Sequence, residues 1–126
     1  MTLSETTVPA YGEDQLAVFR SALLHELEHA TLTVNTLEID LVAIQQARMG
    51  AQTDDASDPE GGASAFEYSQ TGAQRANVRA HAEEIVAALA RLDAGVYGEC
   101  IRCHEPIAPA RLEARPSTPF CIDCTR

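Results

Sequence analysis

The sequence predicts a mainly α-helical protein, in which an antiparallel coiled-coil helical hairpin precedes a small C-terminal module. Three observations support this prediction. Apolar residues recur at alternating steps of four and three along two long segments, the pattern of a coiled-coil seam. A stretch rich in Asp, Gly and Pro separates the two segments. All four cysteines lie behind the second segment, as two Cys-x-x-Cys pairs.

Residues 1–13 are polar and show no hydrophobic periodicity, so we expect a flexible N-terminal tail there. The stretch has neither the basic start nor the apolar run of a secretory signal peptide. No segment approaches the roughly 18 apolar residues that a membrane span needs. Because reduced thiols suit a reducing compartment, we expect a cytoplasmic protein that does not associate with a membrane.

The hairpin is predicted over residues 14–94. Its first helix is expected to begin at Asp14, a residue type that caps helix N-termini well, and to end at Gly50, where a C-terminal cap would fall. Neither Pro nor Gly interrupts the chain between these two positions. The seam of this helix consists of Leu23, Leu27, Ala30, Val34, Leu37, Leu41 and Ile44.

The second helix is expected to begin at Ser64, which forms a capping-box pattern with Glu67, or later at Thr71. It is expected to end before Gly95. Two seams joined by a short loop bury each other only if their helices run antiparallel. The seam of the second helix consists of Val78, Ala82, Ile85, Leu89 and Leu92.

Residues 51–63 are predicted to form the loop at the tip of the hairpin, because a Pro and paired Gly residues oppose helix formation there. The stretch is acidic, and acidic loops are often only solvated surface. At the end of a helix pair about 50 Å long, at 1.5 Å per residue, carboxylates could instead contact basic side chains of a partner. The candidate partner-binding residues are Asp54, Asp55, Asp58 and Glu60.

Residues 95–126 are predicted to form a zinc finger of the four-cysteine type. Two residues between cysteines let one tight turn direct both thiolates at one ion, and a second such pair completes a tetrahedron of soft ligands. Four protein ligands leave no open position, so we expect one structural Zn²⁺. A disulfide framework or a redox pair fits less well, because the sequence shows neither a signal peptide nor a βαβ pattern. The predicted ligands are Cys100, Cys103, Cys121 and Cys124.

The charge distribution argues against a nucleic-acid reader. The formal net charge is −10, and all nine basic residues are Arg. A protein that binds DNA or RNA by itself needs a basic face to neutralise phosphates. We therefore expect no direct sequence-specific binding to nucleic acid.

The segment from His25 to His29 matches the His-Glu-x-x-His pattern of zinc proteases, with Glu26 as the residue that would activate water. Leu27 belongs to the predicted seam, which turns both histidines towards solvent. A protease would also need a third ligand and a walled cleft. We therefore expect that this protein is not an enzyme.

The C-terminal residues resemble the DksA/TraR family of zinc-finger transcription factors. The likeness is specific over residues 89–124 and only architectural before them. It rests on the runs Gly95-Val-Tyr-Gly-Glu-Cys-Ile-Arg-Cys103, Glu105-Pro-Ile107, Arg111-Leu-Glu-Ala-Arg-Pro116 and Cys121-Ile-Asp-Cys124.

The resemblance implies a regulator that binds RNA polymerase and inserts the hairpin tip through the secondary channel, where acidic residues act near the catalytic centre and modulate initiation. We expect the protein to be a monomer. The family's Asp-x-x-Asp-x-Ala tip pattern is matched by Asp55 and Asp58, but Glu60 replaces the Ala. The alternative, from another class, is a zinc-stabilised coiled-coil adaptor that docks on a different protein or pairs with itself, without any effect on polymerase.

The resemblance also bears on a nucleotide. In the best-known members the regulatory effect is coupled to guanosine tetraphosphate. The basic residues that hold it are replaced here by Asn77, Glu84 and Thr125. We therefore expect no guanosine tetraphosphate site of that kind.

Overall fold

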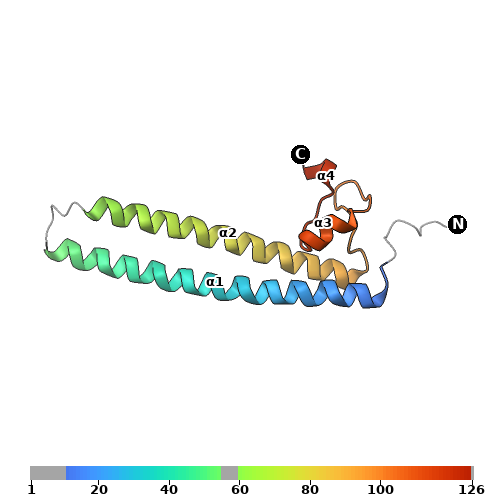
Figure 1. The fold of residues 1–126 in the computed structure, drawn as a ribbon. Coiled ribbons are helices and arrows are strands. Elements are labelled where there is room, and N and C mark those ends of the chain that lie inside the picture. The colour runs from blue at the N-terminus through green and yellow to red at the C-terminus, as the bar shows by residue number, and fades with distance from the viewer. Residues whose placement is uncertain (1–10, 55–59, 126) are drawn as a thin grey trace. The chain divides into compact units, whose positions relative to one another are not determined.

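Two long helices make up most of the protein (Figure 1). The computed structural model describes residues 11–54 and 60–125, except for the side chains of 51–54 and 60–62. The only β-structure in these ranges is a single antiparallel bridge between Glu99 and Pro106. No helix within them is long and apolar enough to cross a membrane. The predicted mainly α-helical fold with a long helical hairpin is confirmed. The helices are α1 (Glu13–Asp54), α2 (Glu60–Ala94), α3 (Pro109–Ala114) and α4 (Ile122–Thr125).

The chain divides into two compact units, each containing parts of both long helices. We call Met1–Glu28 together with Ala82–Arg126 the finger unit, and His29–His81 the arm unit. The boundary that the sequence predicts between a hairpin and a separate finger, at residue 94, does not coincide with this division. The cysteine-bearing segment shares one unit with the first turns of α1 and the last turns of α2.

Helix α1 begins one residue earlier than predicted, and its N-cap is Gly12 rather than Asp14. The Gly12 carbonyl accepts the first helical hydrogen bond, from the Leu16 amide at 3.0 Å. The Gln15 side chain reaches back and accepts a hydrogen bond from the Gly12 amide, also at 3.0 Å. This is the backward half of a capping box, with Gln at the third helical position. The predicted cap at Asp14 was wrong by two residues.

The predicted tip loop is too long, because both helices continue into it. Helix α1 runs past Gly50 to Asp54, and α2 begins at Glu60 rather than at Ser64 or Thr71. A helical glycine costs only about 1 kcal/mol relative to alanine, which the pairing of two long helices offsets. A proline just before a helix is also compatible with a helix start. Of the predicted tip residues, Asp54 and Glu60 are therefore helical, whereas Asp55 and Asp58 lie outside the described residues.

The predicted seams are confirmed. In the first helix every seam residue is buried or half-buried, and Leu23 is fully buried. The same holds for the seam of the second helix, where Ile85 is fully buried. A four-three spacing places these side chains on one stripe of each helix, and burying that stripe is what holds a helix pair together.

The core of the finger unit combines aliphatic seam residues with aromatic rings. The ring of Phe19 lies 5.4 Å from that of Tyr11 and 5.1 Å from that of Tyr97, measured between centroids. The Tyr97 hydroxyl donates a buried 2.9 Å hydrogen bond to the Pro116 carbonyl. Burial raises the pKa of Tyr97, so the hydroxyl remains a donor. The buried cluster comprises Phe19, Leu23, Ile85, Ala88, Leu92, Tyr97, Cys100, Ile107 and Leu112.

Gly95 ends α2, as the sequence predicts. Its φ of 80° lies in the left-handed region that glycine tolerates. The Gly95 amide donates to the Leu92 carbonyl, and the Val96 amide donates to the Arg91 carbonyl. These two bonds form a Schellman motif. They turn the chain out of α2 at a fixed angle, which directs the following residues into the first cysteine pair.

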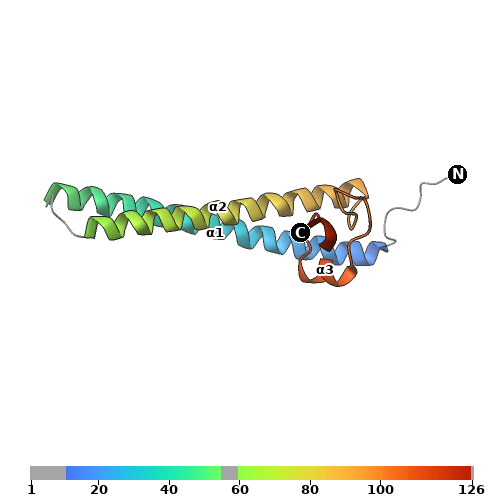
Figure 2. The same ribbon diagram turned by 90° about the horizontal axis from the view of Figure 1, so that it is seen from above.

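In the arm unit the two long helices lie side by side (Figure 1, Figure 2). Glu38 of α1 lies 3.7 Å from the Arg75 guanidinium of α2, and the Arg48 guanidinium stands 5.9 Å from the ring centre of Tyr68. Among the described residues of this unit, the buried hydrophobic ones are only Ala30 and Leu41. The arm unit therefore has a thin core.

Candidate metal centre

The first cysteine pair sits on a tight turn between two short antiparallel segments. The Cys100 amide donates a 2.9 Å hydrogen bond to the Glu105 carbonyl, and the Ile107 amide donates a 2.8 Å bond to the Gly98 carbonyl. Gly98 has a φ of 92°, a conformation that only glycine adopts without strain. This ladder reverses the chain and brings Cys103 back beside Cys100.

The second pair lies at the start of α4: Cys121 directly precedes the helix and Cys124 belongs to it. The Cys121 carbonyl accepts hydrogen bonds from the Cys124 and Thr125 amides. Arg111 of α3 holds this turn in place. Its guanidinium donates to the Phe120 carbonyl at 3.0 Å and to the Thr125 hydroxyl at 2.9 Å. One planar side chain thus fixes the chain on both sides of the second Cys-x-x-Cys pair, as the fork geometry of arginine allows.

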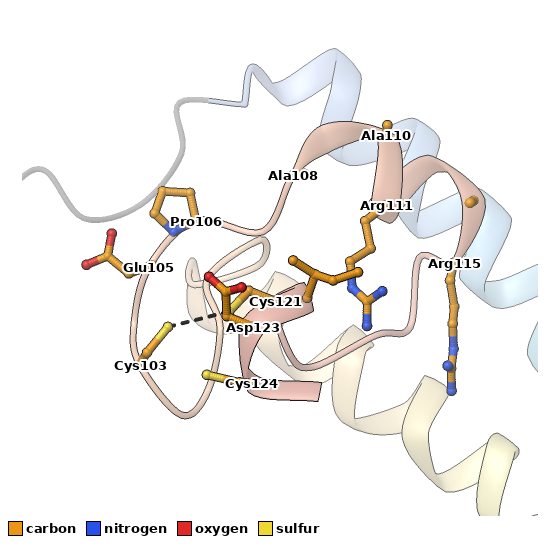
Figure 3. Close-up of a pocket in the computed structure, with 12 residues that line it drawn as sticks. Cys103, Glu105, Pro106, Ala108, Ala110, Arg111, Arg115, Cys121, Asp123 and Cys124 are labelled. Carbon is orange, nitrogen blue, oxygen red and sulfur yellow. Dashed lines mark hydrogen bonds between the residues drawn. The ribbon is translucent and has the colours of Figure 1, made fainter. Parts of the chain in front are cut away.

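The structure brings all four predicted ligands together. The four cysteine sulfur atoms lie within 4.8 Å of one another. Those of Cys103 and Cys121 are 3.7 Å apart, and Figure 3 shows them approaching across the turn. Four sulfurs around a tetrahedral zinc at a bond length of about 2.3 Å would be separated by roughly 3.8 Å. The cluster therefore fits a zinc ion. Cys103, Cys121 and Cys124 also line a hollow of about 960 Å³.

The thiols have unequal proton affinities. Burial alone would raise the pKa of Cys100, but backbone amides, among them that of Cys103, stabilise its thiolate and lower the pKa to about 6. Burial raises the pKa of Cys124 to about 12, and the neighbouring thiols add to the shift. Four sulfurs this close cannot all lose their protons without a compensating positive charge. A divalent cation bound among them would supply that charge.

A second contact fastens the cysteine-bearing segment to α2. Arg115, just after α3, donates a 3.0 Å hydrogen bond to the Glu84 carboxylate. The buried Ser117 hydroxyl donates to the same carboxylate oxygen at 3.3 Å. Glu84 stands where the resemblance implies a basic residue that holds guanosine tetraphosphate. In this chain the Glu84 carboxylate instead forms an ion pair with Arg115.

The His-Glu-x-x-His segment does not form a metal site in the structure. His25 and His29 are both exposed, and Glu26 is half-buried. Among the described residues, the cysteines are the only group of three or more His, Cys, Asp or Glu side chains whose ligand atoms converge. His104, next to Cys103, lies 3.4 Å from the Glu99 carboxylate and is not part of the sulfur cluster.

Comparison with known proteins supports this site. Residues 95–126 match the family model of the prokaryotic DksA/TraR C4-type zinc finger. The RNA polymerase-binding transcription factor DksA of Haemophilus influenzae is 48% identical over 42 residues, which are 33% of this chain and 29% of that protein. Residues 95–126 are therefore a zinc finger of the DksA/TraR type. A C4-type finger with its four cysteines clustered indicates one structural zinc.

The fold of the chain is also that of a DksA protein. The structure of transcription factor DksA2 from Pseudomonas aeruginosa matches with a TM-score of 0.74 over 90% of this chain and 81% of that one. Sequence identity in this match is 22%, so it supports the fold and nothing beyond it. The chain covers less than a third of the length of the Haemophilus DksA in the sequence match.

Sequence reasoning found the cysteines but missed the residues that position them. Arg111 and Glu84 act through bonds to carbonyl and hydroxyl groups distant in the chain. Neither hydrophobic periodicity nor a sequence motif predicts such long-range hydrogen bonds. The sequence did hold one weak signal, since Arg111 and Arg115 lie four residues apart on a short segment between the cysteine pairs.

Proposed function

We propose that the protein is a non-enzymatic transcription regulator that binds RNA polymerase. The observation that carries this proposal is the finger of residues 95–126. It matches the DksA/TraR model, and it occurs on a helical hairpin with the DksA2 fold. The matching part of the Haemophilus relative belongs to a protein described as RNA polymerase-binding. A negatively charged chain with no Lys suits a protein partner better than a nucleic acid.

In this proposal the segment that joins α1 to α2 enters the secondary channel of the polymerase. Asp54, Asp55, Asp58 and Glu60 act there, near the active centre. Four carboxylates within seven residues produce a strong local negative potential. Such a potential can attract Arg or Lys side chains, or compete for water and metal near a catalytic site. The consequence is a change in initiation at particular promoters.

The zinc has a structural role in this proposal. Cys100, Cys103, Cys121 and Cys124 would each supply a thiolate, which leaves no open position for a substrate. Bound zinc would fix two turns of the finger unit to each other and contribute directly to the free energy of folding. Hydrogen bonds within the chain hold each turn. Arg111 holds the turn of the second cysteine pair, and the backbone bonds around Cys100 hold the turn of the first pair.

We further propose that the form that enters the channel is a monomer, and that it acts without guanosine tetraphosphate. The Glu84 carboxylate is engaged with Arg115 and Ser117 of the same chain. A carboxylate at this position would repel a polyphosphate rather than bind it.

Two linked experiments test the proposal. Immobilised protein should retain RNA polymerase core enzyme, and the wild-type protein should change the yield of initiated transcripts on a promoter panel in vitro. The Asp55→Asn/Asp58→Asn variant should still bind polymerase but lose most of the effect on transcripts. A matched control is Glu28→Gln/Asp40→Asn, which removes two charges from exposed positions of α1. It should behave as wild type.

Failure to retain polymerase would overturn the proposal and favour the adaptor alternative. Retention with equal activity of the tip variant and the control would preserve polymerase binding but overturn the role of the acidic tip.

A further inference from the structure

Helix α1 carries a second apolar stripe in the arm unit, and this stripe has no partner in the described chain. Its apolar members are Leu32, Ile39, Val42 and Met49, which are 59%, 69%, 56% and 59% exposed. Leu32 and Ile39 lie two residues after the seam residues Ala30 and Leu37, and Val42 lies two residues before Ile44. At 3.6 residues per turn this offset corresponds to about 200° around the helix. Leu32 and Ile39 therefore lie on the side of α1 away from α2. Val42 lies nearer the edge of that side, where it lines a hollow together with Tyr68 and Arg75 of α2.

With two polar residues included, the stripe is a complete heptad seam. The positions follow one another at steps of three and four. Four of the six are apolar, and the other two are exposed amides. In sequence order the positions are Leu32, Asn35, Ile39, Val42, Gln46 and Met49. A seam of this kind on an exposed face is what a coiled-coil partner would cover.

The order of the residues suits a second copy of the same helix. The seam is symmetric about the point between residues 40 and 41. If a second copy of α1 runs antiparallel with that point on a two-fold axis, Ile39 meets Val42 of the second copy. Leu32 then meets its Met49, and Asn35 meets its Gln46. Each apolar residue is paired with an apolar residue and each amide with an amide, and two amides can exchange hydrogen bonds.

The shape of the surface agrees with this register. A hollow of about 650 Å³ on α1 is lined by Asn35, Glu38, Ile39, Val42, Ala43 and Gln46. These six residues form two adjoining four-residue holes that share Ile39 and Val42. In the symmetric register, Val42 of the second copy falls on one hole and Ile39 of the second copy on the other. That is the knobs-into-holes packing of a coiled coil.

No like charges face each other at the middle of this register. Glu38 is the only charged residue directly beside the middle of the seam, and Arg75 of the same chain lies 3.7 Å from it. In the antiparallel register the residue across from Glu38 is Gln45 of the second copy. A parallel pair would also match apolar with apolar and amide with amide, with each residue on its own counterpart. The Asn35→Arg/Gln46→Glu variant therefore decides between the two registers.

We propose that the arm unit pairs with a second copy of this chain, through an antiparallel, two-fold symmetric contact along Leu32–Met49. A two-fold interface uses the same patch on both copies, and a self-complementary seam meets that requirement. With only four apolar residues per copy the contact is weak. We expect a dissociation constant between about 10 µM and 1 mM, as for interfaces below the standard size. In the dimer the stripe of α1 would be covered. On dilution the dimer would dissociate into monomers, the form proposed to bind polymerase.

Sedimentation velocity of the full-length, zinc-loaded protein tests this inference, over concentrations from about 1 µM to 1 mM. The weight-average mass should rise from monomer towards dimer. The variant Ile39→Glu/Val42→Glu places like charges opposite each other twice, and should raise the dissociation constant at least tenfold. A matched control, Ala47→Glu, adds a charge at an exposed position beside the seam and should leave the constant within threefold.

A charge pair tests the register. In the Asn35→Arg/Gln46→Glu variant, an antiparallel pair places each Arg opposite a Glu, whereas a parallel pair places Arg on Arg and Glu on Glu. We expect a dimer at least as tight as wild type, which weakens as salt rises. A monomeric charge variant would overturn the antiparallel register. Dimerisation that survives Ile39→Glu/Val42→Glu would assign the contact to another surface.

A wild-type protein that stays monomeric throughout would overturn the inference outright. If polymerase retention were then lost in Ile39→Glu/Val42→Glu, the stripe would belong to the polymerase contact. This result is distinct from failure of the proposed function, because the proposed function is judged with wild-type protein below the dimer range.

Discussion

The finger unit and the arm unit use the same two helices in opposite ways. In the finger unit, aromatic rings, a buried tyrosine hydrogen bond and the cysteine cluster surround Leu23 and Ile85, which are fully buried. In the arm unit the described side chains bury little, and Ile39 on the outer stripe is 69% exposed. One pair of helices thus carries a well-packed end and a sparsely packed stretch.

This difference indicates that the finger unit determines the stability of the fold and that the arm unit offers surface for binding. A well-packed core with several long-range hydrogen bonds specifies one arrangement and tolerates few changes. A thin core with exposed apolar residues leaves surface for partners. We therefore expect substitutions in the finger unit to change stability, and substitutions in the arm unit to change association.

Loss of the metal should have the largest effect. A Cys121→Ser variant should bind no zinc where the wild type binds one, because structural zinc sites contribute about 10 kcal/mol or more of apparent binding free energy. Two of the three tyrosines, Tyr11 and Tyr97, belong to the finger unit. The near-ultraviolet circular dichroism of the variant should collapse, while much of the far-ultraviolet helix signal remains.

The matched control for metal loss is His25→Ala, which should keep one zinc and both signals. Two zinc ions in the wild type, or loss of zinc in His25→Ala, would contradict the assignment of the site. Disappearance of the whole helix signal in Cys121→Ser would show that the arm unit cannot stay folded without the finger unit.

Two leucines of α1 should sharpen the comparison of stability. Leu23→Ala removes a fully buried side chain from the finger unit and should cost about 2–5 kcal/mol of unfolding free energy. Leu32→Ala removes a 59% exposed side chain from the arm unit and should cost less than about 0.5 kcal/mol. Urea unfolding at low micromolar concentration measures both. Similar costs would show that the arm packs as tightly as the finger.

Arg111 should control how firmly the finger holds its metal. An Arg111→Lys variant keeps the charge but loses the fork that bonds Phe120 and Thr125. Zinc affinity should fall about tenfold, in the range seen for residues that orient metal ligands. Competition with a chromogenic chelator measures it. Arg102→Lys is the control, because Arg102 stands 5.5 Å from the centre of the Phe120 ring and should matter less.

The ion pairs should show the smallest difference. Double-mutant cycles should give Glu84 and Arg115 a coupling near the upper end of about 0.2–1 kcal/mol, since the pair is short and Glu84 is only 25% exposed. Glu38 and Arg75 in the arm unit are 3.7 Å apart and more exposed, so their coupling should lie at the lower end. Equal coupling energies would show that the ion pairs of the finger unit and the arm unit contribute alike.

Local rules and periodicity recovered most of the fold. The seam of Leu23 to Ile44 and the end of α2 at Gly95 were predictable, because a helix face and a left-handed glycine depend on neighbouring residues. The helix ends near the tip were not, because the glycines at 50, 61 and 62 suggest a break that the paired helices override. The cap at Gly12 depends on a glutamine three residues later.

The site was predictable only in part, for a related reason. Two Cys-x-x-Cys pairs predict a metal site from their spacing alone, without knowledge of the surrounding fold. The contacts of Arg111 with Phe120 and of Glu84 with Arg115 exist only after the chain has folded. The second seam of α1 was readable as a heptad repeat. It became meaningful only when the structure showed those residues exposed.

The most direct test of the account is transcription by RNA polymerase with wild-type protein, the Asp55→Asn/Asp58→Asn variant and the Glu28→Gln/Asp40→Asn control, all at concentrations where each binds polymerase. We expect altered initiation with wild type and control, and at least a tenfold weaker effect with the tip variant. Equal effects from all three proteins, or no polymerase binding by the wild type, would contradict it.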